Sequence, residues 1–72
     1  MSMPTAWQIF SDPDSYIGKE VSPSWDQRGK LVSVEQTNPY GSSKIRLFIE
    51  EEYGNKTFVV ERDFNEGVTV RD

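Results

Sequence analysis

The segment Lys44-Ile45-Arg46-Leu47-Phe48-Ile49-Glu50 gives the clearest indication of the fold. Its second, fourth and sixth residues are aliphatic, and the residues between them are charged, except for Phe48. Successive side chains of a β-strand point to opposite faces, so this period of two predicts a strand with one buried face. Phe48 should then lie on the other face, between Arg46 and Glu50.

Further strand-like segments flank this one and are separated by turn-forming residues. The predicted strands cover residues 19–21, 30–37, 44–50, 56–61 and 68–70. In the second of them, Val32 and Val34 should share a face opposite Leu31. Gly29 suits a bulge or a close backbone approach. A tight helical turn over residues 62–67, with Phe64 turned inward, should precede the last strand.

The N-terminal part of the chain has a different character. Residues 1–10 predict a first strand or an arm over an open end of the core, with a partner-docking peptide as the alternative. Residues 11–14 form a helix-start signal, and Gly18 can adopt a positive φ that ends the helix. We therefore expect an arm with a short helical turn over residues 1–16 and a β-domain over residues 17–72.

The composition restricts the chemistry that the chain can perform. It has 72 residues, enough for one small domain, with no histidine and no cysteine. These absences remove most nucleophiles, proton shuttles and soft-metal ligands that act near neutral pH, and also disulfides and structural zinc. We expect a protein that is not an enzyme, has no cofactor and is held together by its apolar core.

The charge balance bears on partners and location. Twelve acidic and eight basic residues give a formal net charge of −4. Such a chain is not steered towards phosphate backbones, so nucleic acid is possible as a partner but disfavoured. The sequence predicts no membrane span and no signal peptide, and the lack of cysteine fits a cytoplasmic location.

The order of these elements resembles an SH3-like small β-barrel of the KOW or Tudor type. The resemblance lies in Gly29-Lys30-Leu31-Val32, in Lys44-Ile45-Arg46-Leu47 and in the Asp63-Phe64 turn before the last strand. It implies a mainly β, five-stranded barrel that binds other molecules. KOW-type domains contact RNA polymerase or ribosomal components, and Tudor-type domains hold methylated side chains in an aromatic cage. This chain is acidic where nucleic-acid-binding KOW domains are basic, and no cage maps onto it.

Phe48 is the first candidate contact residue, because an exposed aromatic side chain among charges is a plausible anchor. Lys44 and Arg46 share its face. Together the three could bind a protein, or could bind an oligonucleotide by base stacking and phosphate contacts. Alternatively, the N-terminal arm covers Phe48 with Trp7.

Aromatic and acidic residues in turns supply the remaining candidates. Trp25, Tyr40 and Tyr53 fall in predicted loops, where they could line a binding groove. Trp25 could instead plug one end of the barrel, and the tyrosines could be surface residues. Glu50 begins the run 50–52, which is either a solvated strand end or a recognition edge for a basic partner.

These observations favour a small regulatory protein that binds a larger protein partner. The SH3-like resemblance suggests RNA polymerase or other transcription or translation machinery as that partner, with the chain acting as a phage-type inhibitor. The alternatives are a nucleic-acid-binding domain and a structural subunit of an assembly.

Overall fold

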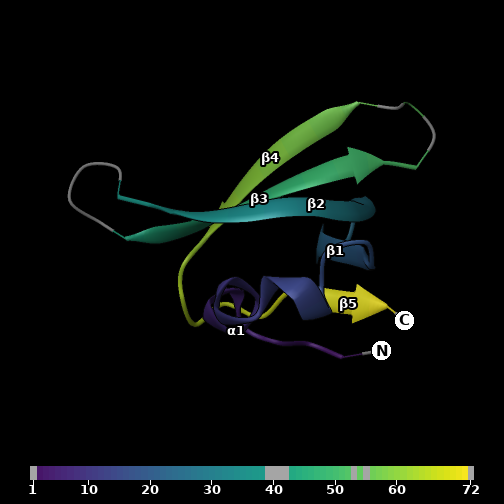
Figure 1. The fold of residues 1–72 in the computed structure, drawn as a ribbon. Helices are drawn as coiled ribbons and strands as arrows, with labels where there is room; N and C mark the ends of the chain where they lie inside the picture. The colour runs from purple at the N-terminus through teal and green to yellow at the C-terminus, as the bar shows by residue number, and fades with distance from the viewer. Residues whose placement is uncertain (1, 39–42, 53, 55, 72) are drawn as a thin grey trace.

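The computed structural model describes residues 2–38, 43–52, 54 and 56–71. Its elements are helix α1 (Ala6–Ser11), 3-10 helix η1 (Pro13–Ser15) and strands β1 (Glu20–Ser24), β2 (Gln27–Thr37), β3 (Lys44–Glu51), β4 (Thr57–Arg62) and β5 (Thr69–Arg71). The strands form one antiparallel sheet in the order β4-β3-β2-β1-β5. Figure 1 shows α1 beneath this sheet and β4 as its outermost strand at the top. The mainly β fold is confirmed, and the described strands do not pair into a closed barrel.

The core forms on one face of the sheet, as the alternation in β3 predicts. Ile45, Leu47 and Ile49 are completely buried. The other buried apolar residues of the core are Ala6, Ile9, Val21, Leu31, Val60, Val68 and Val70. Burial of aliphatic side chains stabilises a fold by about 25 cal/mol per Å² of apolar surface removed from water. This shared core fixes which face of β3 is left for solvent and partners.

A β-bulge changes the expected alternation in β2. The register of β2 against β3 shifts between Leu31 and Ser33. An extra residue in one strand reverses which side chains face the core beyond that point. Leu31 is therefore buried and Val34 packs against the core, whereas Val32 is 44% exposed. The prediction that Val32 and Val34 share a face is wrong for this reason.

Gly29 confirms the prediction of a close backbone approach. A Cβ atom built on Gly29 would lie within 3 Å of the Glu50 carbonyl oxygen and of the Ile49 side chain. Such a contact with backbone cannot relax as a flexible side chain would, so only glycine lets β2 and β3 approach each other here. This position holds the start of β2 against the end of β3.

The N-terminal segment contains a helix at residues 6–11 in place of the predicted strand or arm. Thr5 and Gln8 form a capping box, in which Thr5 Oγ1 accepts from the Gln8 amide at 3.1 Å and the Thr5 amide donates to Gln8 Oε1 at 2.8 Å. Helix α1 then buries Ala6 and Ile9 in the core that the strands share. The predicted helix start near Pro13 is the short η1, and Gly18 follows it with a φ of 95°. The domain boundary after residue 16 stays a prediction.

Candidate functional site

The candidate contact surface is the face of β2, β3 and β4 opposite the core, here called the outer face. Phe48 occupies its centre and lies between its cross-strand neighbours Ser33 and Val59. Val59 is 49% exposed, and Val32 beside the bulge is 44% exposed. Val32, Phe48 and Val59 form an apolar row on the outer face. Phe48 is partly exposed in this row, on the face that the sequence predicts.

Helix α1 does not cover the apolar row, because it packs on the core side of the sheet. The Trp7 ring lies 4.9 Å from the Phe64 ring and 5.7 Å from the Phe10 ring, measured between centroids. Trp7 is therefore engaged beside the turn that precedes β5. The alternative in which Trp7 covers Phe48 is wrong.

Arg46 is held by carboxylates of its own chain. Its guanidinium forms 3.0 Å ion pairs with Glu61 on β4 and Glu35 on β2, which face it across the sheet. The hydrogen bond to Glu61 and the nearby charges raise the pKa of Arg46. A phosphate or a partner carboxylate would have to displace two existing ion pairs to bind Arg46. The main role of Arg46 is therefore to connect β2, β3 and β4 on the outer face.

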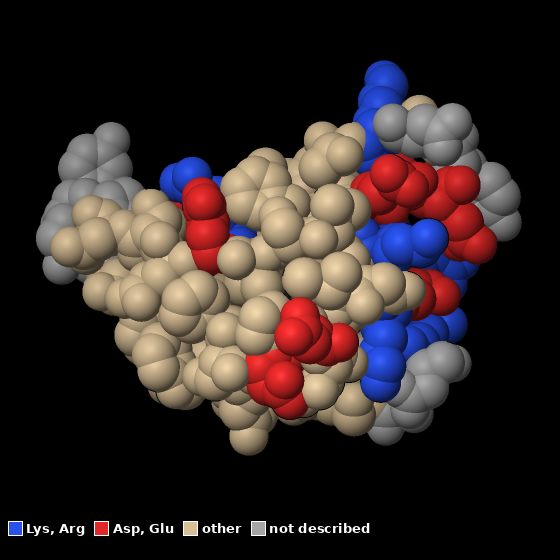
Figure 2. Space-filling view, in the orientation of Figure 1, with Lys and Arg blue, Asp and Glu red and all other residues tan. Residues whose placement is uncertain are grey.

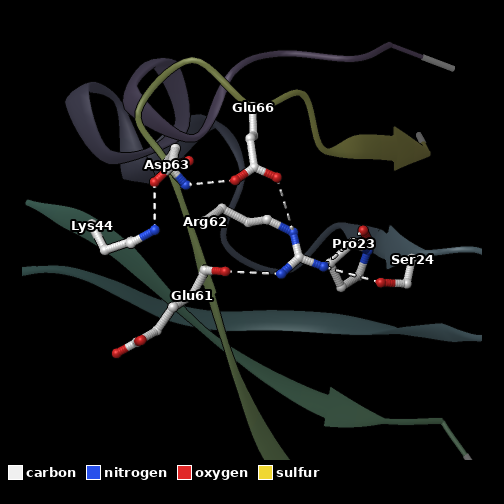
Figure 3. Close-up of polar contacts among 7 residues, drawn as sticks. All are labelled: Pro23, Ser24, Lys44, Glu61, Arg62, Asp63 and Glu66. Atoms are coloured by element: carbon white, nitrogen blue, oxygen red, sulfur yellow. Dashed lines mark hydrogen bonds and ion pairs between the residues drawn. The ribbon is translucent and has the colours of Figure 1, made fainter.

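Lys44 is also paired within the chain. Its Nζ lies 2.5 Å from a carboxylate oxygen of Asp63, in the turn after β4 (Figure 3). This contact raises the pKa of Lys44 and lowers the pKa of Asp63. Both cations that the sequence places beside Phe48 are therefore engaged by carboxylates.

Arg62 connects the end of β4 to β1, an arrangement that the sequence does not indicate. Its side chain is 20% exposed and lies on the core side of β4, in register with Ile45. The guanidinium donates to the carbonyl oxygens of Glu61 at 2.8 Å and Pro23 at 3.0 Å. It also donates to Ser24 Oγ at 3.0 Å and lies 3.9 Å from the Glu66 carboxylate (Figure 3). The two strands are joined here by a side chain instead of by strand pairing.

Trp25 lies at the tip of the hairpin between β1 and β2 and is 96% exposed. The alternative in which it plugs one end of a barrel is therefore wrong. A hollow of about 350 Å³ lies beside this tip. It is lined by Asp26, Gln27, Arg28, Glu51, Glu52 and Phe58. Trp25 is thus a large exposed ring beside a recess lined by both charged residues and Phe58. Tyr40 and Tyr53 lie outside the described residues.

Glu50 lies on the outer face at the charged end of the sheet. Its cross-strand partners are Lys30 and Thr57, so the first residue of the acidic run faces a cation. A hollow of about 290 Å³ lies next to it and is lined by Gly18, Glu20, Gly29, Lys30 and residues 50–52. Figure 2 shows acidic and basic side chains interleaved at the right, where β3 ends in Figure 1. Within the described ranges, no group of three or more side chains is placed to hold a metal ion.

Comparison of the chain with protein families, with curated proteins and with solved structures finds no significant match. No helix in the described part of the chain is long and apolar enough to cross a bilayer. The candidate site is therefore defined by the geometry and chemistry of this chain alone.

Proposed function

We propose that this chain is a non-enzymatic regulatory protein that binds a larger protein partner through its outer face. The observation that supports this most is the uncovered apolar row of Val32, Phe48 and Val59. Complete burial of a valine or phenylalanine side chain contributes about 1.5–3 kcal/mol. A protein surface that covers the row would gain part of this free energy at each residue, and the paired charges around the row would form a polar rim.

Trp25 supplies a second contact point at the hairpin tip. Tryptophan is enriched among the residues that dominate the energy of protein interfaces, because its large ring adds area at little conformational cost. An exposed fraction of 96% leaves nearly all of that ring available. A partner that reaches both the outer face and the hairpin tip would bind more tightly than one that covers either alone.

The architecture that best accounts for the sheet is a partly open SH3-like barrel. The strand order β4-β3-β2-β1-β5 and the Arg62 contacts to Pro23 and Ser24 support this assignment. By analogy with KOW-type domains, RNA polymerase and the ribosome are the first partners to test, with the chain as a phage-type inhibitor in the cytoplasm. A fold-level analogy of this kind suggests a partner class without identifying the partner.

The nucleic-acid alternative has weaker support. It requires Lys44 and Arg46 to contact phosphates beside Phe48. Lys44 is paired with Asp63, and Arg46 is paired with Glu35 and Glu61. Binding would therefore have to replace internal ion pairs in a chain that already carries a net charge of −4. This alternative predicts an affinity that falls steeply as salt concentration rises.

Affinity capture with matched variants tests the proposal. The tagged chain is exposed to purified RNA polymerase, to ribosomes and to nuclease-treated cell lysate. We expect wild type to retain one large protein in stoichiometric amount, and Phe48→Ser and Trp25→Ala to retain markedly less. Ile17→Ser is the control, because Ile17 is 43% exposed but lies outside the outer face and the hairpin tip.

Two results would contradict this proposal. One is equal retention by all variants, which would exclude the outer face and the hairpin tip as the contact surface. The other is retention of nucleic acid alone when nuclease is omitted, which would favour the alternative. Arg46→Glu is a poor probe, because it would place a third carboxylate beside Glu35 and Glu61 and would weaken the sheet itself.

A further inference from the structure

The outward backbone groups of β4 can be assigned from its pairing with β3. Glu51 and Lys56 lie opposite each other, and the Glu51 amide donates to the Lys56 carbonyl at 2.8 Å. Opposed residues in an antiparallel ladder alternate between hydrogen-bonded and non-hydrogen-bonded pairs. Phe58, Val60 and Arg62 therefore direct their backbone N–H and C=O groups towards β3. Thr57, Val59 and Glu61 direct theirs towards the free edge.

This edge has little to block it. Among the described residues, no hydrogen bond reaches the outward groups of Thr57 or Val59, and only the Glu61 carbonyl is engaged, by the Arg62 side chain. Exposed edges are commonly blocked by proline, by inward-facing charge or by a covering segment. The inward-facing charge of β4, Arg62, lies at the end of the strand and is engaged by Glu66, Pro23 and Ser24. The edge carries Val59 at its centre, and Val59 is the edge end of the apolar row.

We propose that the β4 edge pairs with β4 of a second copy of this chain, antiparallel, about a two-fold axis at Val59. In this register Val59 lies opposite Val59 of the second copy, and Thr57 lies opposite Glu61 of the second copy. All three residues direct their backbone groups outward, so the ladder can continue across the axis. The Glu61 carbonyl, which already accepts from the Arg62 side chain, would accept from the Thr57 amide of the second copy with its second lone pair. The two sheets become one sheet.

The side chains are compatible with this register on both faces. On the outer face, the two apolar rows join at Val59 into one longer row. On either side of Val59, the Thr57 hydroxyl of one copy faces the Glu61 carboxylate of the other. On the core side, Phe58 lies opposite Val60 of the second copy. Lys56 lies opposite Arg62, but the Arg62 guanidinium is turned towards Glu66, Pro23 and Ser24. No pair of carboxylates is opposed, and the like-charged pair of Lys56 and Arg62 lies at the ends of the paired segment, so residues 57–61 are complementary to themselves.

Net charge opposes this association. Each copy carries a formal charge of −4, so two copies repel each other at low ionic strength. Salt screens this repulsion over about 10 Å at 0.1 M. Self-association should therefore strengthen as salt is added, which is opposite to the salt dependence of phosphate binding.

Sedimentation equilibrium of the purified full chain, from micromolar to millimolar concentration, tests the proposal. We expect a monomer–dimer equilibrium in wild type. Val59→Lys places two like charges opposite each other and should weaken dimerisation about tenfold, equivalent to about 1.4 kcal/mol. Val32→Lys is the matched control, because its exposure is similar but β2 is an interior strand. It changes the net charge by the same amount as Val59→Lys, so at a salt concentration that screens the net repulsion it should dimerise like wild type.

A gain-of-affinity variant tests the register. Thr57→Lys sets a cation opposite Glu61 of the second copy at two symmetric positions, and at low salt it should strengthen the dimer severalfold relative to Val32→Lys, which lowers the net negative charge by the same amount. In wild type, hydrogen exchange at the amides of Thr57, Val59 and Glu61 should slow as protein concentration rises. Neither measurement depends on how well Val59→Lys folds.

The proposal is overturned if wild type remains a monomer at millimolar concentration, or if Val59→Lys dimerises like wild type. Equal weakening by Val32→Lys would indicate stacking of two outer faces and would also overturn edge pairing. A Thr57→Lys variant without any gain would overturn the register at Val59. Because these measurements use the chain alone, they are independent of whether the proposed protein partner exists.

Discussion

The two edges of the sheet differ in what their outward backbone groups contact. At the β5 edge, the Ser2 amide donates to the Val70 carbonyl at 2.9 Å, and the Val70 amide donates to the Ser2 carbonyl at 2.8 Å. The Val68 amide donates to the Pro4 carbonyl at 2.8 Å. The N-terminal segment therefore covers one edge, and in Figure 1 it lies alongside β5. At the β4 edge, no described segment takes this place.

The covered β5 edge contributes to the stability of the fold, whereas the β4 edge can pair with another strand. A covered edge satisfies its hydrogen bonds internally and cannot template another strand. An open edge keeps its backbone groups in water and can pair with a new strand at little structural cost. The N-terminal segment is thus a structural part of this small domain. Among the described residues, the β4 edge at the other end of the sheet stays open to pairing.

Proline substitution in β4 should have the largest effect and should distinguish the two sides of that strand. Val60→Pro removes an N–H that donates to β3, leaves its acceptor unpaired and replaces a buried core side chain, so it should lower the free energy of unfolding by about 3 kcal/mol or more. Val59→Pro removes an outward N–H and should cost much less, because proline is tolerated where the edge faces solvent. Chemical denaturation measures both. Equal losses would mean that the β4 edge is not open.

Removal of the covering segment should have the next largest effect. Deletion of residues 2–4 leaves a backbone carbonyl before Thr5 but eliminates the two backbone hydrogen bonds between Ser2 and Val70. At about 0.5–1.5 kcal/mol each, their loss should destabilise the domain by about 1–3 kcal/mol. Hydrogen exchange should then accelerate at the amide of Val70, while the β3–β4 ladder keeps its relative protection. Unchanged exchange at Val70 would show that the segment does not cover this edge.

The smallest expected effect concerns the ion pair at the end of β4. Lys44 lowers the pKa of Asp63 below its usual value of 3.8. A carboxylate with a lowered folded-state pKa stabilises the fold above its unfolded-state pKa, and this contribution is lost as pH falls through the folded-state pKa. Asp63→Asn should therefore melt slightly below wild type at neutral pH, and the difference should disappear in acid. A constant difference across this pH range would exclude the ion pair as its cause.

Local sequence chemistry predicts several elements correctly because one residue or one short pattern determines them. The alternation in β3 fixes its buried face, Gly18 adopts a positive φ, and Gly29 allows a close approach of two strands. The helix at residues 6–11 was also visible in principle. Thr5 with Gln8 three residues later is a capping-box signature, and it outweighs the strand-like character of the apolar residues that follow.

Other features depend on neighbours that lie far away in the sequence. The bulge at Val32 arises from the register of β2 against β3, so the local alternation of residues 30–37 could not reveal it. The engagement of Arg46 depends on Glu35 and Glu61, which come from two different strands. Exposure of Trp25 likewise depends on how its hairpin projects from the sheet.

The amino-acid sequence is enough to predict a small, acidic, mainly β domain whose core lies on one face of β3. Its composition and its period-two patterning are enough for those conclusions, because burial follows from side-chain chemistry and strand geometry. Which charges are paired and which edge of the sheet is covered can be read only from the folded chain. Both depend on long-range register, which places residues far apart in the chain within hydrogen-bonding distance of each other.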